Sequence, residues 1–403
     1  MLKHHKSEPR KREEVYQLLM DTKSTVQQIG YNVCGYLNEV YEDAVELDSS
    51  NSAFLLGEEF RESTFFYEKW NLFSRMTYRR DWADPMLNPK TQIVYDSDTG
   101  WGCTIRSSQM LLANLRLVDV KNFLDRESSN FSIHRFVHSG GKFVGDWLGP
   151  TSGALALAAL IRRHIPNKLG VLASLDGRIY VPSLQYESVT RGEQEGSSNE
   201  WSGRSPSWEL CGEVADISER AEIQIDETEY EGPRRLSEMS ISSENDSPGK
   251  SRPVLILCPI RLSADEEIPS ACVPALLAYM RLPFFAGLIG GPDKRCMYIP
   301  GCLGTTLLCI DPHIVQDAAV VRTDSEFRNS ANPTRLDPFK LGSSLCISFF
   351  LENLDFEEFQ NQINYIQQNV DNSFIEIRTD NFPETKNREF NPSLVENDDI
   401  VLL

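Results

Sequence analysis

The chain has 403 residues, a formal net charge of −19 and nine cysteines, and 40% of its residues are hydrophobic. The length alone suggests two or three domains, and the excess of acidic residues excludes nucleic acid as a partner and a polybasic attachment to anionic lipid. An odd number of cysteines without a Cys-x-x-Cys pair is typical of a reducing compartment, and no apolar stretch reaches the roughly 20 residues of a membrane span, so we expect a soluble, cytoplasmic, monomeric protein.

Apolar residues recur at steps of three and four between residues 13 and 43, which predicts a helical N-terminal extension over residues 1–45. Gly30 and Gly35 interrupt this apolar stripe. Two interpretations stay open: a surface helix or helix pair docked on the core, or an arm that forms a coiled coil or binds a partner. Dense aromatic residues then mark the beginning of the core, and residues 46–380 are expected to form the main domain.

Cys103 follows a glycine-punctuated turn, residues 98–102, and precedes an amphipathic run over residues 104–117. The thiol is therefore predicted at the N-terminus of a helix. Unpaired N–H groups and the positive end of the helix dipole stabilise an anionic sulfur there by roughly 1 kcal/mol. Because the thiolate is the reactive form of cysteine, Cys103 is a candidate nucleophile. A small, buried, unreactive cysteine is the alternative.

A second helix is predicted over residues 152–164, where alanine is frequent. Between residues 186 and 250 the chain loses its periodicity and becomes rich in serine and acidic residues. This composition predicts a long disordered insertion inside one continuous fold. Short phosphorylation patterns occur at Ser205, Ser237 and Ser247, but such patterns carry little information.

After residue 253 the pattern predicts buried strands and two further helices. Strands are expected over residues 254–260, 284–289, 297–299, 305–310 and 345–351. One helix is expected from Ser270, as its N-cap, to Arg281, and another over residues 356–370. A polar, flexible tail is expected over residues 381–403.

The strand over residues 305–310 ends in Asp311, Pro312 and His313. Residues two apart at a strand end point to the same side, so the carboxylate and the imidazole can share one site. An imidazole near a thiol takes up its proton, stabilises the thiolate and later protonates a leaving amine, while a carboxylate fixes the orientation of the ring. The alternative for His313 is an ordinary histidine in a surface turn.

Three other patterns do not fit the sites that they suggest. Residues 287–294 are rich in glycine and end in a lysine, but they lack the spacing of a phosphate-binding loop. Cys302, Cys309 and His313 are too irregularly spaced for a zinc site. No Gly-x-Ser-x-Gly nucleophile elbow occurs. We therefore expect neither a metal nor a cofactor.

The chain resembles the autophagins, which are cytosolic cysteine peptidases of autophagy. Residues 98–103, followed by Arg106 and Gln109, resemble the nucleophile motif of that family, and residues 311–313 resemble its acid and histidine motif. Further blocks match at residues 54–57, 76–79, 132–134, 147–150, 287–291 and 336–338. The resemblance implies an α+β, papain-like peptidase domain over residues 46–380, with a central, mainly antiparallel sheet and helices around it.

The resemblance also implies a role for each candidate residue. Cys103 is expected to be the nucleophile, His313 the general base and acid, and Asp311 the carboxylate that orients the imidazole. Tyr78 is expected to donate its hydroxyl to the oxyanion, and the backbone N–H of Cys103 is a second donor. For Tyr78, an ordinary core tyrosine is the alternative.

Trp147 matches a tryptophan that covers a narrow channel for the substrate's glycine, and we expect Gly290 and Gly291 to bind substrate beside it. Core packing is the alternative for Trp147. The implied substrate is a small ubiquitin-like modifier, which is cut after its C-terminal glycine and later released from phosphatidylethanolamine. Both reactions hydrolyse an amide through a thioester acyl-enzyme. Membrane contact is then peripheral, through the lipidated substrate. A non-catalytic adaptor that binds the modifier on the same fold is the alternative function.

The chain departs from the family pattern in three places. Pro292 follows Gly291 directly, where relatives carry a lysine-proline pair in a loop that gates the site. Residues 107–108 are serines where relatives often carry cysteine and glycine, which puts redox control through that cysteine in doubt. Ile400 stands where the aromatic of a docking motif would be, so Ile400 and Leu403 are weak candidates for adding a strand to the modifier, against a frayed terminus.

Overall fold

The structure is a computed structural model, and it describes residues 30, 32, 44–47, 51–189, 251–319, 324–329 and 331–380. Most of the expected N-terminal helix, the insertion from residue 190 to 250, and the tail with Ile400 and Leu403 lie outside the described residues. Gly30 and Asn32 are helical, and the Asn32 side chain accepts a hydrogen bond of 2.8 Å from the backbone N–H of Val315. At this position the expected helix contacts the core.

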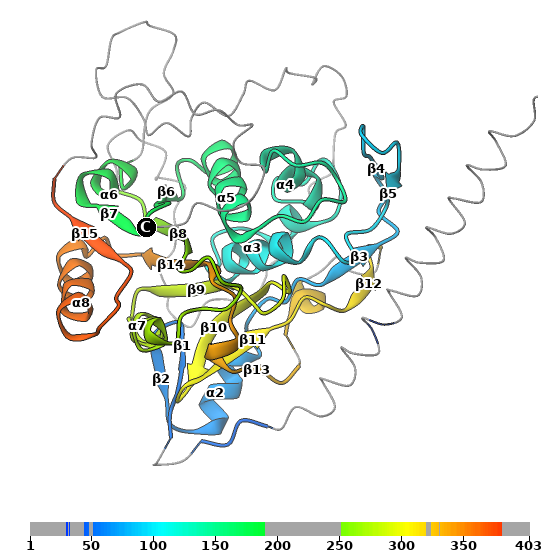
Figure 1. The fold of residues 1–403 in the computed structure, drawn as a ribbon. Coiled ribbons are helices and arrows are strands. Elements are labelled where there is room, and N and C mark those ends of the chain that lie inside the picture. The colour runs from blue at the N-terminus through cyan, green and yellow to red at the C-terminus, as the bar shows by residue number, and fades with distance from the viewer. Residues whose placement is uncertain are drawn as a thin grey trace, which may run out of the picture.

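A nine-stranded, mainly antiparallel sheet lies at the centre of the fold, as the resemblance implied (Figure 1). Its path runs β13-β11-β10-β9-β14-β8-β6, with β1 paired to β10 and β2 to β1, and the β6-β8 pair is parallel. The strands are β1 (Ala53–Leu55), β2 (Glu58–Phe60), β6 (Gly170–Ala173), β8 (Val254–Arg261), β9 (Phe285–Gly290), β10 (Met297–Leu303), β11 (Thr306–Ile310), β13 (Thr334–Leu336) and β14 (Ser344–Leu351).

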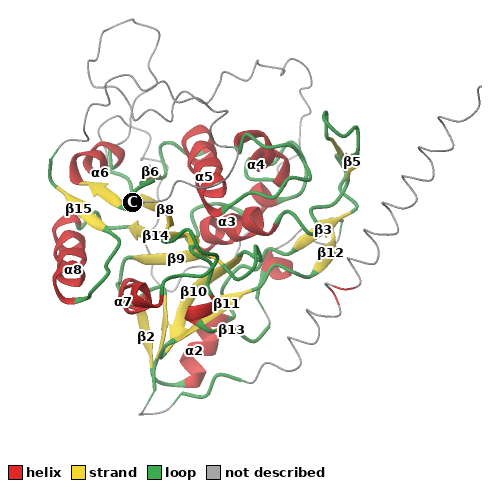
Figure 2. Cartoon of the chain, viewed as in Figure 1, coloured by secondary structure: helices red, strands yellow, loops and turns green. Residues whose placement is uncertain are grey.

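Helices cover both faces of this sheet (Figure 2). The α-helices are α2 (Ser63–Trp70), α3 (Cys103–Asn114), α4 (Ile133–Ser139), α5 (Pro150–His164), α6 (Val181–Glu187), α7 (Val273–Met280) and α8 (Phe356–Asn369). Leu255 and Leu257 of β8 belong to the core with α3, α4 and α5, whereas Val254 and Ile256 belong to the core with α7 and α8. Because neighbouring strand residues point to opposite faces, one strand lines both cores, which explains its unbroken apolar sequence.

The strands expected after residue 253 are confirmed by β8, β9, β10, β11 and β14, with ends that differ by at most four residues. The expectation that Ser270 is the N-cap of α7 is wrong, whereas the expected end of this helix is confirmed, because Arg281 is the C-cap. Residues Ser270–Cys272 form a 3-10 turn in which the Cys272 N–H bonds the Pro269 carbonyl over 2.8 Å. The α-helix begins only at Val273, where a proline in its first turn fixes a helical φ without needing a hydrogen bond.

The two ends of the expected insertion lie side by side. Val189 forms a bridge with Ser251, and the Glu187 carboxylate lies 3.3 Å from Arg252 and 3.5 Å from Arg162. Helix α6 ends at Glu187, so it runs two residues into the segment that the composition assigned to the insertion. The chain therefore leaves the fold and returns to it at one place.

Three two-stranded sheets complete the described fold. Strand β3 (Tyr78–Arg80) pairs in parallel with β12 (Val315–Asp317), and β7 (Arg178–Tyr180) pairs in parallel with β15 (Glu376–Arg378). Strand β4 (Met86–Leu87) pairs with β5 (Val94–Tyr95) in an antiparallel hairpin. Among the helices described, none is long and apolar enough to cross a membrane.

Candidate active site

Cys103 is the first residue of α3, as the sequence predicted. Gly102 is the N-cap, and the side chain of Cys103 is buried at 1% exposure. Trp147 donates the hydrogen of Nε1 to Cys103 Sγ over 3.2 Å. The thiol thus lies at the positive end of a 12-residue helix and receives a directed hydrogen bond, and both interactions favour the anionic sulfur.

Asp311 and His313 follow directly after β11 and contact each other. The backbone N–H of His313 donates to Asp311 Oδ1 over 2.8 Å, and Nδ1 of its ring bonds the same oxygen. The side chain of His313 is 3% exposed and also hydrogen-bonds Cys103. The ring nitrogen facing Asp311 therefore carries a proton, and the opposite nitrogen can exchange a proton with the thiol.

The charges of these three side chains support one another. Burial favours the neutral thiol, yet the hydrogen bond and the charge of His313 lower the pKa of Cys103 below its usual value. Burial likewise opposes the charge on His313, but its bonds to Asp311 and Cys103 raise its pKa to about 9. Burial disfavours the Asp311 carboxylate too, whereas its bonds with His313 lower its pKa to about 2. The lowered pKa of Cys103 and the raised pKa of His313 both favour a thiolate and imidazolium pair, flanked by a carboxylate.

Tyr78 lies beside the histidine. Its strand, β3, places it opposite Val315 of β12, and its backbone N–H bonds the Pro312 carbonyl over 3.0 Å. The rings of Tyr78 and His313 meet edge to face, with centroids 5.4 Å apart and planes at 88°. A tyrosine that lies 25 residues before the cysteine in the sequence is thus brought to His313.

A pocket of about 570 Å³ is lined by Trp147 and Lys294, which both contact Cys103, although Cys103 itself does not line it. The expected substrate-binding residues Trp147, Gly290 and Gly291 all line it. The loop after Gly291 then folds over the thiol, because the Lys294 carbonyl lies 3.7 Å from Cys103 Sγ. A side chain at position 291 would meet the Arg295 carbonyl, so this turn requires glycine.

Two residues at the end of this loop were not predicted from the sequence. The backbone N–H of Cys296 hydrogen-bonds Cys103, and a guanidinium nitrogen of Arg295 lies 3.6 Å from Asp311 Oδ2. Neither residue stands in a recognisable motif, so no pattern in one sequence could have found them. Within the described ranges, no group of histidine, cysteine and acidic residues could hold a metal ion.

A cysteine at the start of a helix that packs on an antiparallel sheet, facing a histidine carried by that sheet, defines a cysteine peptidase of papain-like fold. A model of the peptidase C54 catalytic domain matches residues 64–120 and 116–362. The chain therefore belongs to the peptidase C54 family.

Known proteins from animals and plants are similar to the chain. Cysteine protease ATG4A of Xenopus laevis is 26% identical over 377 residues, which cover 83% of each chain. Cysteine protease ATG4A of Homo sapiens is 25% identical over 329 residues, 73% of this chain and 72% of the relative. Cysteine protease ATG4b of Arabidopsis thaliana is 25% identical over 324 residues, 73% of this chain and 59% of the relative. The resemblance to the autophagins is confirmed.

Proposed function

We propose that Cys103 is the nucleophile of this peptidase, with His313 as general base and acid and Asp311 as the carboxylate that orients the imidazole. The mutual contacts of the three side chains, together with the lowered pKa of Cys103 and the raised pKa of His313, support this assignment. Burial alone raises the pKa of a thiol. A cysteine that only fills the core would keep that raised pKa, whereas the contact with His313 lowers the pKa of Cys103.

The reaction follows from these positions. The Cys103 thiolate attacks the scissile carbonyl, a C–S bond forms, and the negative charge moves to the carbonyl oxygen. The backbone N–H of Cys103 and the hydroxyl of Tyr78 hydrogen-bond that oxygen. The His313 imidazolium protonates the leaving nitrogen as the C–N bond breaks, which leaves a thioester. The neutral imidazole then takes a proton from water, the hydroxide attacks the thioester, and the thiolate is released.

The proposed substrate is a ubiquitin-like modifier of autophagy, which is cut after its C-terminal glycine and is also released from phosphatidylethanolamine. The names of the relatives support a protease of the autophagic pathway. Trp147 contacts the thiol directly, and once its ring moves aside a glycine, which has no side chain, needs less room between them than any other residue. The reaction is proposed for a cytoplasmic monomer built on residues 46–380.

The site is closed in this structure. Cys103 and His313 are 1% and 3% exposed, and the loop from Gly291 to Arg295 lies over the thiol. The C-terminal tail of a modifier can bring its scissile carbonyl to the Cys103 thiol only after this loop and the Trp147 ring move aside. The loop is therefore proposed to gate the site.

The direct test follows the mass of a modifier precursor that carries residues beyond its glycine. The wild-type protein is expected to remove those residues with a single cut, and Cys103→Ala is expected to leave the precursor intact. Cys272→Ala removes a thiol outside the site and should cut like the wild type. Equal rates for wild type and Cys103→Ala would support the adaptor function instead, and a cut elsewhere than after the glycine would contradict the proposed specificity.

A further inference from the structure

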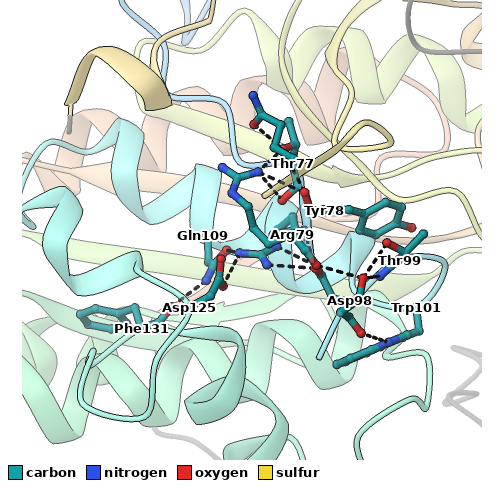
Figure 3. A network of polar contacts seen from close by, with 12 residues as sticks. Thr77, Tyr78, Arg79, Asp98, Thr99, Trp101, Gln109, Asp125 and Phe131 are labelled. Carbon is teal, nitrogen blue, oxygen red and sulfur yellow. Dashed lines mark hydrogen bonds and ion pairs between the residues drawn. The ribbon is translucent and has the colours of Figure 1, made fainter. Parts of the chain in front are cut away.

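Asp98 is a fully buried carboxylate at the start of the turn that leads to Cys103. It takes no part in the reaction proposed above. Its oxygens accept three hydrogen bonds: from the backbone N–H of Arg79 over 2.7 Å, from Arg106 Nε over 2.7 Å and from Arg106 Nη2 over 3.0 Å. Figure 3 shows this carboxylate at the centre of a polar network between β3 and α3.

The backbone of Asp98 builds the turn before the nucleophile. Its carbonyl accepts the N–H groups of Trp101 over 3.2 Å and Gly102 over 2.9 Å. A Cβ atom on Gly102 would lie 2.4 Å from Asp98 Oδ2, so the carboxylate packs against the residue next to Cys103. Any displacement of Asp98 therefore moves the N-terminus of α3.

The same residue fixes β3 from the other side. Asp98 donates its backbone N–H to the Arg79 carbonyl over 3.2 Å and accepts the Arg79 N–H with its side chain. Tyr78 precedes Arg79 and bonds Pro312, the neighbour of His313. One carboxylate thus connects the turn that carries the nucleophile with the strand that carries the proposed oxyanion donor.

Arg106 connects the Asp98 carboxylate to helix α3. It lies one turn after Cys103 on α3 and is 1% exposed. Two of its nitrogens face Asp98, while Nη1 lies 2.9 Å from Asp125 and donates to Gln109 Oε1 over 3.1 Å. Desolvating such charges is expensive, and apolar side chains would stabilise a core as well or better. A bidentate pair of guanidinium and carboxylate, in contrast, fixes the angle between the two groups as well as their distance.

We propose that Asp98 is a positioning residue that sets the distance between the Cys103 nucleophile and the Tyr78 hydroxyl. The inference rests on the function proposed above, since it concerns the same oxyanion. Asp98 touches no substrate atom. It acts through Arg106 on the helix and through Arg79 on the strand, so that the two donors to the oxyanion are in place before the substrate binds.

The test compares Asp98→Asn with Asp125→Asn. Both variants remove one carboxylate from Arg106, and both carboxylates act on the Arg79 charge, but Asp98 also hydrogen-bonds the Arg79 backbone and forms the turn before Cys103. The new amide cannot accept from both Arg79 and Arg106 without turning an N–H₂ group toward a donor. We expect kcat for precursor cleavage to fall about 10- to 100-fold in Asp98→Asn, with KM changed less than about threefold, and kcat to change less than about threefold in Asp125→Asn.

A double-mutant cycle with Tyr78→Phe separates positioning from general loss of structure. If Asp98 acts on the Tyr78 hydroxyl, Asp98→Asn should cost less than about threefold once that hydroxyl is absent. The proposal would be overturned if the reductions in kcat caused by Asp98→Asn and Tyr78→Phe multiply in the double variant. Equal reductions in kcat in Asp98→Asn and Asp125→Asn would overturn it as well. In that case, loss of cleavage in the single variant Cys103→Ala would still support the proposed function. Failure of the proposal for Asp98 can therefore be told apart from failure of the proposed function.

A second variant applies if Asp98→Asn does not fold. Asp98→Asn combined with Arg106→Gln removes both charges of this pair and keeps two amides that can bond each other, while the opposite charges of Asp125 and Arg79 remain. This variant also lacks the bidentate pair of Asp98 and Arg106, so we expect a folded protein with kcat below about one tenth of the wild-type value. Wild-type kcat in this variant would contradict the role of Asp98.

Discussion

Burial raises the thiol pKa at five cysteines other than Cys103, which are Cys258, Cys272, Cys296, Cys302 and Cys346. Burial acts in the same direction on the pKa of Cys103. At Cys103 alone among these six, a neighbouring charge reverses the direction. The difference at the scale of single residues is therefore not the helix start by itself, which the sequence indicated, but the contact with His313. That contact joins residues 210 positions apart, and only the fold creates it.

The role of Asp311 is tested by the pH profile. Although burial opposes its charge, the bonds to Asp311 and Cys103 together raise the pKa of His313 to about 9, so the imidazolium, which is the proposed proton donor to the leaving amine, persists up to that pH. Asp311→Asn removes the negative charge, and the imidazolium then loses its proton at a lower pH. We expect the alkaline limb of kcat/KM to move down from about 9 by at least about one unit, toward the ordinary histidine value of about 6.5.

Arg295→Gln is the control for this shift, because Arg295 contacts the other oxygen of Asp311 and is 48% exposed. Its effect on the alkaline limb should stay within about 0.3 unit, since solvent screens an exposed charge. An unchanged limb in Asp311→Asn would mean that the carboxylate does not tune the proton donor.

At the scale of elements, Trp147 and the loop after Gly291 close the site together. Trp147→Ala should open the channel at the cleaved position. We expect kcat/KM for a precursor with alanine in place of the glycine to rise about tenfold relative to the glycine precursor. Trp147→Phe keeps a ring over the channel and loses only the hydrogen bond to Cys103 Sγ, so its preference for glycine should match the wild type. Equal preference in all three proteins would exclude Trp147 as the cover.

Elements with strong local patterns could be predicted from the sequence. The apolar strand β8, the helix start at Cys103 and the helix α8 each carry their signal within a few neighbouring residues. Strands β3, β7, β12 and β15 were missed because each has three residues and is stabilised by a distant partner. Residues 178–180, for example, pair with residues 376–378 across the insertion. The position of Arg295 and Cys296 against the site follows from the loop's path, which no spacing encodes.

At the scale of the whole molecule, the insertion is expected to be dispensable. Joining Val189 to Ser251 through a short glycine-serine linker should leave folding and precursor cleavage close to wild type, because these residues already form a bridge. Deleting residues 186–250 is the sharper comparison. It also removes Glu187, whose carboxylate pairs with the buried Arg252, and should lower the free energy of unfolding by roughly 1–3 kcal/mol.

Thermal unfolding and cleavage rates of the two deletions check this expectation. Loss of cooperative unfolding in the deletion that begins after Val189 would show that the insertion belongs to the core. Equal stability of the two deletions would contradict the part assigned to Glu187.

The central claim is that Cys103 attacks the carbonyl of a modifier's terminal glycine. A modifier that carries a vinyl methyl ester in place of this glycine traps the attacking thiol as a stable thioether, and peptide mass spectrometry then locates the bond. We predict one modifier per chain, attached at Cys103, with no adduct in Cys103→Ser and a much slower adduct in His313→Ala. Attachment at the neighbouring Cys296, or no adduct with the wild-type protein, would contradict the account.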